Sequence, residues 1–269
     1  MRSPIGIFDS GLGGLSVARE VIARLPRESI IYFADTAHVP YGERPLSEIR
    51  GFALDITRFL IEQGAKSVVM ACNMSSAVAL DEARCRWPET PIIGVIEPGA
   101  RTAVRVAQGY PVGVLATTGT VKSMAYVSAV HKIDPSVKVV QQACPRFVPL
   151  VESGRADSEE AEAAARDYVA PLLRADCRTI VLGCTHYPFL RRAIASAAGP
   201  RVVIVDPAEE TARVLAKVLH DGGITSDAPE GRHLFFASGE TRGLIELGSR
   251  FLGRQITEVF SRQPSGVGT

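Results

Sequence analysis

Short apolar runs alternate along the chain with longer stretches in which apolar residues recur every three to four positions. Most of the short runs are continuous, which is typical of strands buried on both faces of a parallel sheet. The longer stretches, such as 47–63 and 159–174, have the spacing of amphipathic helices. The alternation predicts an α/β fold with mainly parallel sheets flanked by helices. The predicted strands are Pro4–Phe8, Ile30–Ala34, Ser67–Ala71, Ile92–Ile96, Val112–Ala116, Val137–Gln141, Thr179–Gly183, Val202–Val205 and Leu234–Ala237.

Three pairs of these apolar strings recur in the same order at nearly constant offset, which indicates an internal repeat. The matched strings begin at Pro4 and Pro111, at Ser67 and Thr179, and at Ile93 and Val202. We therefore predict two pseudo-symmetric lobes with the active site in the cleft between them. The first comprises residues 1–98 and 206–260, because the last strand and helix are expected to return to it. The second comprises residues 99–205, and residues 261–269 are expected to form a disordered tail.

Composition excludes several classes of protein. The 269 residues are 46% hydrophobic and 22% charged, which is ordinary for a globular chain and unlike a disordered one. Thirty basic and twenty-nine acidic side chains give a net charge of +1, so nothing favours a nucleic-acid partner or a charged membrane surface. No apolar run is long enough to span a membrane, and no export signal precedes the first strand. Five cysteines, an odd number without a C-x-x-C pair, indicate reduced thiols in the cytoplasm.

The polar residues that follow the strands are the candidate site residues, because ligands of open parallel sheets bind beyond the carboxyl ends of the strands. In the second lobe, Glu152 is expected in a loop after the second strand. If the lobes face each other, each contributes one thiol to the cleft. The strand-end residues are Asp9, Ser10, Asp35, Thr36, Cys72 and Asn73 in the first lobe, and Thr117, Thr118, Cys184, Thr185 and His186 in the second.

Paired thiols suit the inversion of a stereocentre, which needs a base on one face of a carbon and an acid on the other. A cysteine serves in both roles because its pKa of ~8.5 leaves thiol and thiolate accessible. Predicted helix starts, with serine caps after Cys72 and with Pro188 after Cys184, would favour the thiolates. Asp9 and His186 are candidates for tuning each thiol or carrying its proton.

These residues also have other interpretations. A free cysteine is often a buried structural residue, and we expect this of Cys85, Cys144 and Cys177. The glycine-rich turn 9–16 with Asp35 partly fits a dinucleotide fingerprint, but Asp9 would repel a pyrophosphate, and the turn could instead hold a substrate carboxylate. Neutral donors fit a small zwitterion better than a phosphate; they are Ser10, Asn73, Ser75, Thr117, Thr118 and Thr185.

We predict neither a metal nor a cofactor. Cys184 and His186 supply only two metal ligands, and no second cluster has ligand spacing. Pyridoxal phosphate needs a Schiff-base lysine, and none of the five lysines follows a predicted strand.

At these residues the sequence resembles the glutamate racemases of the cofactor-independent aspartate/glutamate racemase superfamily, from Ile5 to about Phe260. The strings that carry the resemblance are I-G-I-F-D-S-G-L-G-G-L-S-V (Ile5–Val17), A-D-T-A-H-V-P-Y-G (Ala34–Gly42), A-C-N (Ala71–Asn73), T-T-G-T (Thr117–Thr120), L-V-E-S-G (Leu150–Gly154) and G-C-T-H-Y-P (Gly183–Pro188).

The resemblance implies interconversion of L- and D-glutamate to supply D-glutamate for peptidoglycan, with a homodimer as a possible assembly. It implies Cys72 and Cys184 as the two acid/bases, assisted by Asp9, Glu152 and His186. The substrate contacts it implies are Asp9, Ser10, Tyr41, Gly42, Asn73, Met74, Ser75, Thr117, Thr118, Thr185 and His186.

Met74 departs from the family pattern, which usually has threonine at this position. Ser75, Ser76 or the backbone N–H of Met74 could take over the lost hydroxyl's contact to a carboxylate. The departure keeps other outcomes open: an aspartate racemase, another cysteine-dependent isomerase or a decarboxylase. A two-lobed amino-acid-binding protein without turnover is the alternative outside the enzymes.

Overall fold

The computed structural model describes residues 3–264. The chain divides into two compact units, one formed by the chain up to Val95 and from Thr211 onward, the other by Ile96–Glu210. Each unit holds one parallel sheet flanked by helices. Among the described residues no helix is long and apolar enough to cross a membrane.

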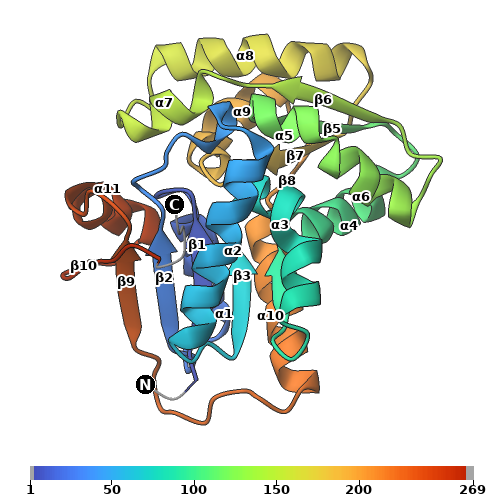
Figure 1. The fold of residues 1–269 in the computed structure, drawn as a ribbon. Helices are drawn as coiled ribbons and strands as arrows, with labels where there is room; N and C mark the ends of the chain where they lie inside the picture. Colours follow the sequence, from blue (N-terminus) through green and yellow to red (C-terminus); the bar gives the residue numbers. More distant parts are fainter. Residues whose placement is uncertain (1–2, 265–269) are drawn as a thin grey trace. The chain divides into compact units, whose positions relative to one another are not determined.

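The first unit is built on a six-stranded parallel sheet with the strand order β10-β9-β2-β1-β3-β4 (Figure 1). Helices α2 and α3 pack together over this sheet, and the core between them includes Phe8, Phe33 and Leu60. Gly6 allows this packing, since a Cβ there would lie 3.0 Å from the Cβ of Leu60. The strands are β1 (Ile5–Asp9), β2 (Ile30–Ala34), β3 (Ser67–Met70), β4 (Ile92–Gly94), β9 (His233–Ala237) and β10 (Phe260–Ser261). The helices are α1 (Leu15–Arg24), α2 (Leu46–Glu62), α3 (Asn73–Arg86), α11 (Arg242–Leu252) and the 3₁₀ turn η1 (Tyr41–Glu43).

The second unit has a four-stranded parallel sheet with the order β6-β5-β7-β8 (Figure 1). Helix α8 packs on α9, β5 and β6, whereas α4 packs on α6, β7 and β8. The strands are β5 (Val112–Ala116), β6 (Val139–Ala143), β7 (Thr179–Gly183) and β8 (Val203–Val205). The helices are α4 (Ile96–Ala107), α5 (Thr118–Ser123), α6 (Ala125–Ile133), α7 (Phe147–Glu152), α8 (Glu159–Arg174), α9 (Arg191–Ala198) and the 3₁₀ turn η2 (Tyr187–Leu190). Helix α10 (Pro207–Asp221) carries the chain back into the first unit.

Strand pairing confirms the internal repeat, because β2-β1-β3-β4 and β6-β5-β7-β8 have the same order. The registers also correspond: Phe8 pairs with Met70 in one sheet, and Leu115 pairs with Leu182 in the other. Met70 and Leu182 each lie two residues before a cysteine. Cys72 and Cys184 therefore occupy equivalent positions beyond the carboxyl ends of equivalent strands.

One of the three sequence matches was wrong in register. Val69 pairs with Ile93, and its equivalent Val181 pairs with Val205. Ile93 therefore corresponds to Val205 rather than to Val202. Runs of valine and isoleucine look alike when they are shifted by a few residues. The sequence therefore could not show that the equivalent of Ile93 lies three residues after Val202.

All nine predicted strands are present. The one expected at Val137–Gln141 lies two residues later, as β6, because its polar glutamines belong to a half-exposed edge strand. The short strand β10 was missed. It pairs with β9, which in turn pairs with β2 and so joins the C-terminal segment to the first sheet, as expected.

The tail begins later than the sequence predicts. Ser261 belongs to β10, and the backbone N–H of Arg262 donates to the carbonyl oxygen of Ala237 over 2.9 Å. The glycine, proline and serine residues that follow Phe260 concealed this pairing. Residues 265–269 of the predicted tail lie outside the described residues.

Helix α2 offers a test of the first unit's core. We expect Leu60→Ala to lower the free energy of unfolding by about 2–5 kcal/mol, because it leaves a cavity at a fully buried position. Leu46→Ala, on the same helix but 44% exposed, should change it by no more than about 0.5 kcal/mol. Urea unfolding followed by Trp87 fluorescence measures both, since Trp87 is the only tryptophan and packs against this core. Equal effects of the two substitutions would contradict the packing described here.

Candidate active site

Asp9 ends β1, and the turn after it folds around the buried carboxylate. Asp9 Oδ2 accepts a hydrogen bond of 3.0 Å from the backbone N–H of Gly11. The carbonyl oxygen of Gly11 in turn accepts a hydrogen bond of 2.9 Å from the Tyr32 hydroxyl. A Cβ on Gly14 would lie 2.4 Å from the Cβ of Asp9, so this position of the predicted glycine-rich stretch requires glycine for close approach.

Cys72 immediately precedes α3, and its buried side chain lies among polar groups of opposing effect. Burial and the nearby charge of Asp9 raise the pKa of the thiol. The hydroxyls of Ser10 and Ser75 and the backbone N–H of Ser75 act in the other direction. The raising effects dominate, and the pKa of Cys72 lies at about 12. The resting form of this residue is therefore the neutral thiol.

The serines after Cys72 do not cap α3, contrary to the sequence prediction; the cap residue is Cys72 itself, without a side-chain capping bond. The hydroxyl of Ser76 donates to the carbonyl oxygen of Met70 over 2.8 Å and accepts from the N–H of Val95. The buried hydroxyl of Ser75 makes no hydrogen bond of ordinary geometry, although it lies near enough to Cys72 to lower the pKa of the thiol. Ser75 is thus a buried polar group available to a ligand.

Met74 lies in a small apolar cluster with Cys72, Tyr41 and Ile49. Its side chain is buried, and it supplies apolar surface beside the thiol where a threonine would supply a hydroxyl. Asn73 is the first residue of α3 and is also buried, while Gly42 follows Tyr41 in η1. The first unit thus brings most of its candidate residues to the carboxyl ends of β1 and β3.

Cys184 has a different neighbourhood from Cys72. Its sulfur lies 3.8 Å from Nδ1 of His186, and Nε2 of His186 lies 3.2 Å from Oε1 of Glu152. Cys184 and His186 are buried, whereas the Glu152 side chain is 45% exposed. A carboxylate only accepts hydrogen bonds, so Nε2 carries a hydrogen and Nδ1 can exchange a proton with the thiol.

The predicted loop position of Glu152 is wrong. Glu152 is the last residue of the short helix α7. The buried side chains of Phe147, Leu150 and Val151 hold this helix in place. A helix of six residues containing a proline gives too little periodicity to be detected in a sequence.

The threonines of the second unit differ in accessibility. Thr117 caps α5 by accepting a hydrogen bond from the N–H of Thr120, and its hydroxyl lies 3.0 Å from that of Thr120. Thr118 is exposed, and Thr185 is buried. Thr117 and Thr185 follow equivalent strands to Ser10 and Asn73, respectively.

Two residues near the candidate site were not predicted to contribute to it. Tyr32 is fully buried in an otherwise apolar strand. Its hydroxyl, a single polar group among apolar residues, is the sequence feature that could have indicated its hydrogen bond to the turn after Asp9. Cys144, predicted to be structural, occupies the position equivalent to that of Asp35. The backbone N–H of Cys144 donates to the carbonyl oxygen of Ala116, and the backbone N–H of Asp35 donates to the carbonyl oxygen of Asp9; both acceptors are the last residues of neighbouring strands. Burial raises the pKa of the Cys144 thiol, and its carbonyl oxygen accepts from the Tyr187 hydroxyl over 3.3 Å.

The five cysteines are free, and Cys85 is the exposed one. Within residues 3–264, no group of three or more histidine, cysteine, aspartate or glutamate side chains is placed to hold a metal ion. What the described residues offer is acid–base chemistry: a thiol beside a carboxylate in one unit, and a thiol beside an imidazole and a carboxylate in the other.

Comparison with known proteins assigns this arrangement to a family. The Asp/Glu/Hydantoin racemase family model matches residues 10–215. A glutamate racemase from Geobacter metallireducens is 48% identical over 95% of both chains. A solved glutamate racemase isoform from Bacillus anthracis has a TM-score of 0.92 and 39% identity over 97% of both chains. One from Francisella tularensis in complex with D-glutamate has a TM-score of 0.92 and 31% identity over 98% of both chains. The chain belongs to the Asp/Glu/hydantoin racemase family and is an amino-acid racemase.

Proposed function

We propose that this racemase interconverts L- and D-glutamate by proton transfer between Cα and two cysteines, Cys72 and Cys184, without a cofactor. The observation that carries the proposal is the equivalence of the two thiols: Cys72 lies two residues after Met70, which pairs with Phe8, and Cys184 lies two residues after Leu182, which pairs with Leu115. A pseudo-symmetric pair of acid/base groups is what a reaction with mirror-image substrate and product requires.

In one direction the thiolate of one cysteine takes the proton from Cα. The C–H bond breaks, its electron pair remains on the substrate as a planar carbanion, and the thiolate becomes a thiol. The opposite thiol then gives its proton to the other face of Cα and becomes a thiolate. Atoms and charge balance, and the mechanism requires that both sulfurs reach one carbon from opposite faces.

Each turnover exchanges the protonation states of the two cysteines, so the enzyme must restore them or accept the opposite enantiomer next. Asp9 and the His186–Glu152 pair are the groups we assign to this task. Burial and, after it, the charge of Asp9 raise the pKa of Cys72, so Asp9 helps to keep the proton on that thiol in the resting state. His186 provides Cys184 with a nitrogen that can accept or return a proton, while Glu152 orients the ring.

Glutamate is the substrate we favour, because the relatives that match nearly the whole chain carry that name and one was solved with D-glutamate. The remaining candidate contacts fit a small dicarboxylic amino acid. Ser10, Asn73, Ser75, Thr117, Thr118 and Thr185 offer neutral donors, and Tyr41, Gly42 and Met74 line the approach to Cys72 in this proposal. Ser75 is favoured as a substrate contact, because its buried hydroxyl makes no ordinary hydrogen bond of its own.

The physiological role that follows is the supply of D-glutamate for peptidoglycan in the bacterial cytoplasm. Free cysteines agree with a reducing compartment. The homodimer expected from the resemblance stays a prediction.

Serine substitutions test the two-cysteine mechanism. We expect Cys72→Ser and Cys184→Ser each to lower kcat for racemisation by roughly 10²–10⁴-fold, because a hydroxyl is a far weaker acid than a thiol. Cys85→Ser, which changes the exposed cysteine, should retain full activity. Polarimetry starting from each enantiomer measures the rates, and incubation in D₂O reports deuterium at Cα. Undiminished racemisation by either variant would refute the assigned role of that thiol, and a panel of amino acids that left glutamate inert would refute the substrate.

The charge of Asp9 makes a prediction about pH. Its removal in Asp9→Asn takes away one cause of the raised pKa of Cys72, so the pKa falls and more thiolate is present at any pH below it. We expect alkylation of Cys72 at pH 8.5 to become up to roughly tenfold faster, which corresponds to one pKa unit. Mass spectrometry of the Cys72 peptide measures the rate, and the Cys85 peptide of the same sample is the control. An unchanged or slower reaction at Cys72 would contradict the effect assigned to Asp9.

The His186–Glu152 pair predicts unequal effects of two substitutions. His186→Asn removes the proton-carrying nitrogen, so kcat should fall by roughly 10²–10⁴-fold. Glu152→Gln keeps an oxygen that can accept from Nε2, so kcat should fall by no more than roughly tenfold. His220→Asn, at an exposed position, is the matched control and should leave kcat unchanged. A loss in Glu152→Gln as large as in His186→Asn would show that Glu152 does more than orient the ring.

A further inference from the structure

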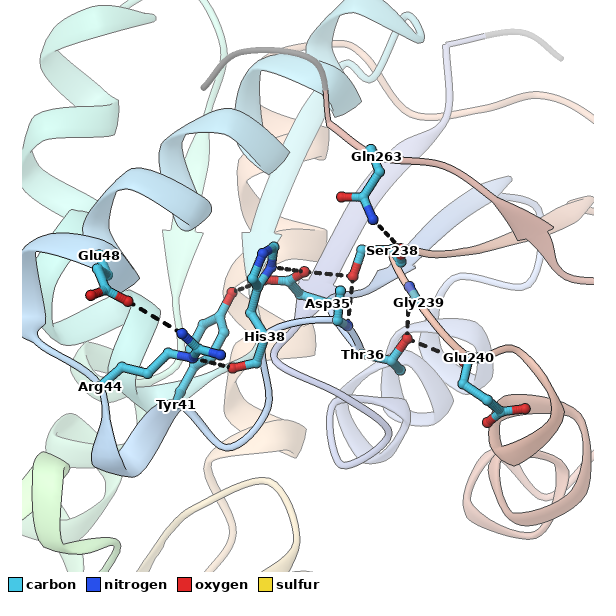
Figure 2. A network of polar contacts seen from close by, with 11 residues as sticks. Asp35, Thr36, His38, Tyr41, Arg44, Glu48, Ser238, Gly239, Glu240 and Gln263 are labelled. Carbon is cyan, nitrogen blue, oxygen red and sulfur yellow. Dashed lines mark hydrogen bonds and ion pairs between the residues drawn. The ribbon is translucent and has the colours of Figure 1, made fainter. Parts of the chain in front are cut away.

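We propose that Ser238, the residue directly after β9, is a positioning residue for the racemase site: its hydroxyl fixes the Asp35 carboxylate, which holds Tyr41 beside Cys72. The inference rests on the proposed roles of Cys72 and Tyr41 in racemisation. Ser238 is separated from Asp35 by more than two hundred residues, yet their side chains are in direct contact (Figure 2).

The Asp35 carboxylate is only 1% exposed and is occupied at both oxygens. Oδ1 accepts hydrogen bonds from the Ser238 hydroxyl over 2.6 Å and from Nδ1 of His38 over 2.8 Å. Oδ2 accepts one from the Tyr41 hydroxyl over 2.5 Å. A buried carboxylate is costly unless donors surround it, so the loss of one donor disturbs the other two contacts.

Tyr41 links this network to the thiol. Its ring belongs to the cluster that contains Cys72 and Met74. Burial raises the pKa of Tyr41, with Asp35 as the next cause and Cys72 and Asp9 as further ones, so its hydroxyl stays a donor to Asp35. The orientation of Tyr41 therefore depends on where the Asp35 carboxylate points.

The Ser238 hydroxyl is used in both directions. It donates to Asp35 (Figure 2). It also accepts a 2.9 Å hydrogen bond from the backbone N–H of Ala37, the second residue after Asp35. The neighbouring Gly239 lies so close that a Cβ there would be 2.9 Å from the nitrogen of Ala37. The N–H of Gly239 donates to the Thr36 hydroxyl, which donates to the carbonyl oxygen of Glu240. Residues 238–240 thus fasten the start of the loop that leads to Tyr41.

The far side of this loop is fastened by residues that lie near it in the sequence. The His38 ring stacks on Phe52 of α2 with centroids 3.9 Å apart, and Nε of Arg44 donates to the carbonyl oxygen of His38. Ser238 completes the enclosure of Asp35 from the opposite segment of the chain. Its own backbone is held by the Gln263 side chain, which donates to its carbonyl oxygen (Figure 2).

The sheet itself does not need this hydroxyl. Strand β9 is already bound to β2 by parallel pairing as far as Ala34 and Ala237, and the N–H of Ser238 continues that pairing to the carbonyl oxygen of Ala34. The Ser238 hydroxyl bonds to Asp35 and Ala37, which both lie in the segment that leads to Tyr41. Its removal should therefore affect the site more than the sheet.

Ser238→Ala tests the proposal against a matched control. We expect the KM for glutamate to rise roughly three- to tenfold with a smaller change in kcat, the effect of one lost hydrogen bond. Ser238→Thr keeps a hydroxyl and should restore most of the loss. Ser249→Ala, also in the C-terminal segment, removes a hydroxyl that bonds to Ile245 and Ile256 instead; it should lower the urea midpoint and leave KM unchanged.

Two further measurements separate positioning from a merely structural role. Alkylation of Cys72 should become faster in Ser238→Ala and not in Ser249→Ala, because a loosened Tyr41 uncovers the thiol. In an Asp35→Asn background, Ser238→Ala should raise KM less than twofold further, since Ser238 acts through Asp35. If Ser238→Ala does not fold, Ser238→Cys, with a weak donor of similar size, replaces it.

An unchanged KM and unchanged Cys72 alkylation in a folded Ser238→Ala variant would overturn the proposal, as would full additivity with Asp35→Asn. These outcomes are distinct from a failure of the proposed function, in which the unaltered chain would not racemise glutamate.

Discussion

The structure depends on the rule that parallel strands end at the same edge of a sheet. This rule gathers residues that are far apart in sequence, such as Asp9, Asp35 and Cys72 in the first unit, at the edge of the sheet where ligands of parallel sheets bind. Repetition of the same strand order in the second unit provides a second thiol at an equivalent position. The equivalent positions of the two thiols follow from the duplication of one framework.

The duplication is not exact around the sulfurs, and the differences matter for chemistry. Cys72 shares its burial with the carboxylate of Asp9, which favours the thiol. Cys184 instead lies beside an imidazole that a carboxylate orients. The equivalent of His186 in the first unit is Met74, which is apolar. Two cysteines at equivalent positions thus have different neighbours: a carboxylate beside one and an imidazole with its carboxylate beside the other.

Most of the fold could be predicted from the sequence, because continuous apolar runs specify buried strands, and the runs that form β1 to β9 were long enough to detect. The two thiols and their neighbours Asp9 and His186 could be selected as candidates for the same reason, since they follow those runs directly. Glu152 was placed in a loop because α7 is too short to show periodicity, and β10 has only two residues. The contact between Ser238 and Asp35 could not be predicted, because it depends on which edge β9 joins, and no local pattern encodes that choice.

The return of the C-terminal segment to the first sheet has a consequence for biosynthesis. The second unit is contiguous in sequence, so all four strands of its sheet can pair as soon as the last of them has left the ribosome. The first unit must wait for β9, and until then β2 presents an unpaired edge of backbone N–H and C=O groups. The usual order of assembly, from the amino terminus onward, is therefore reversed in this chain: the middle can mature before the beginning.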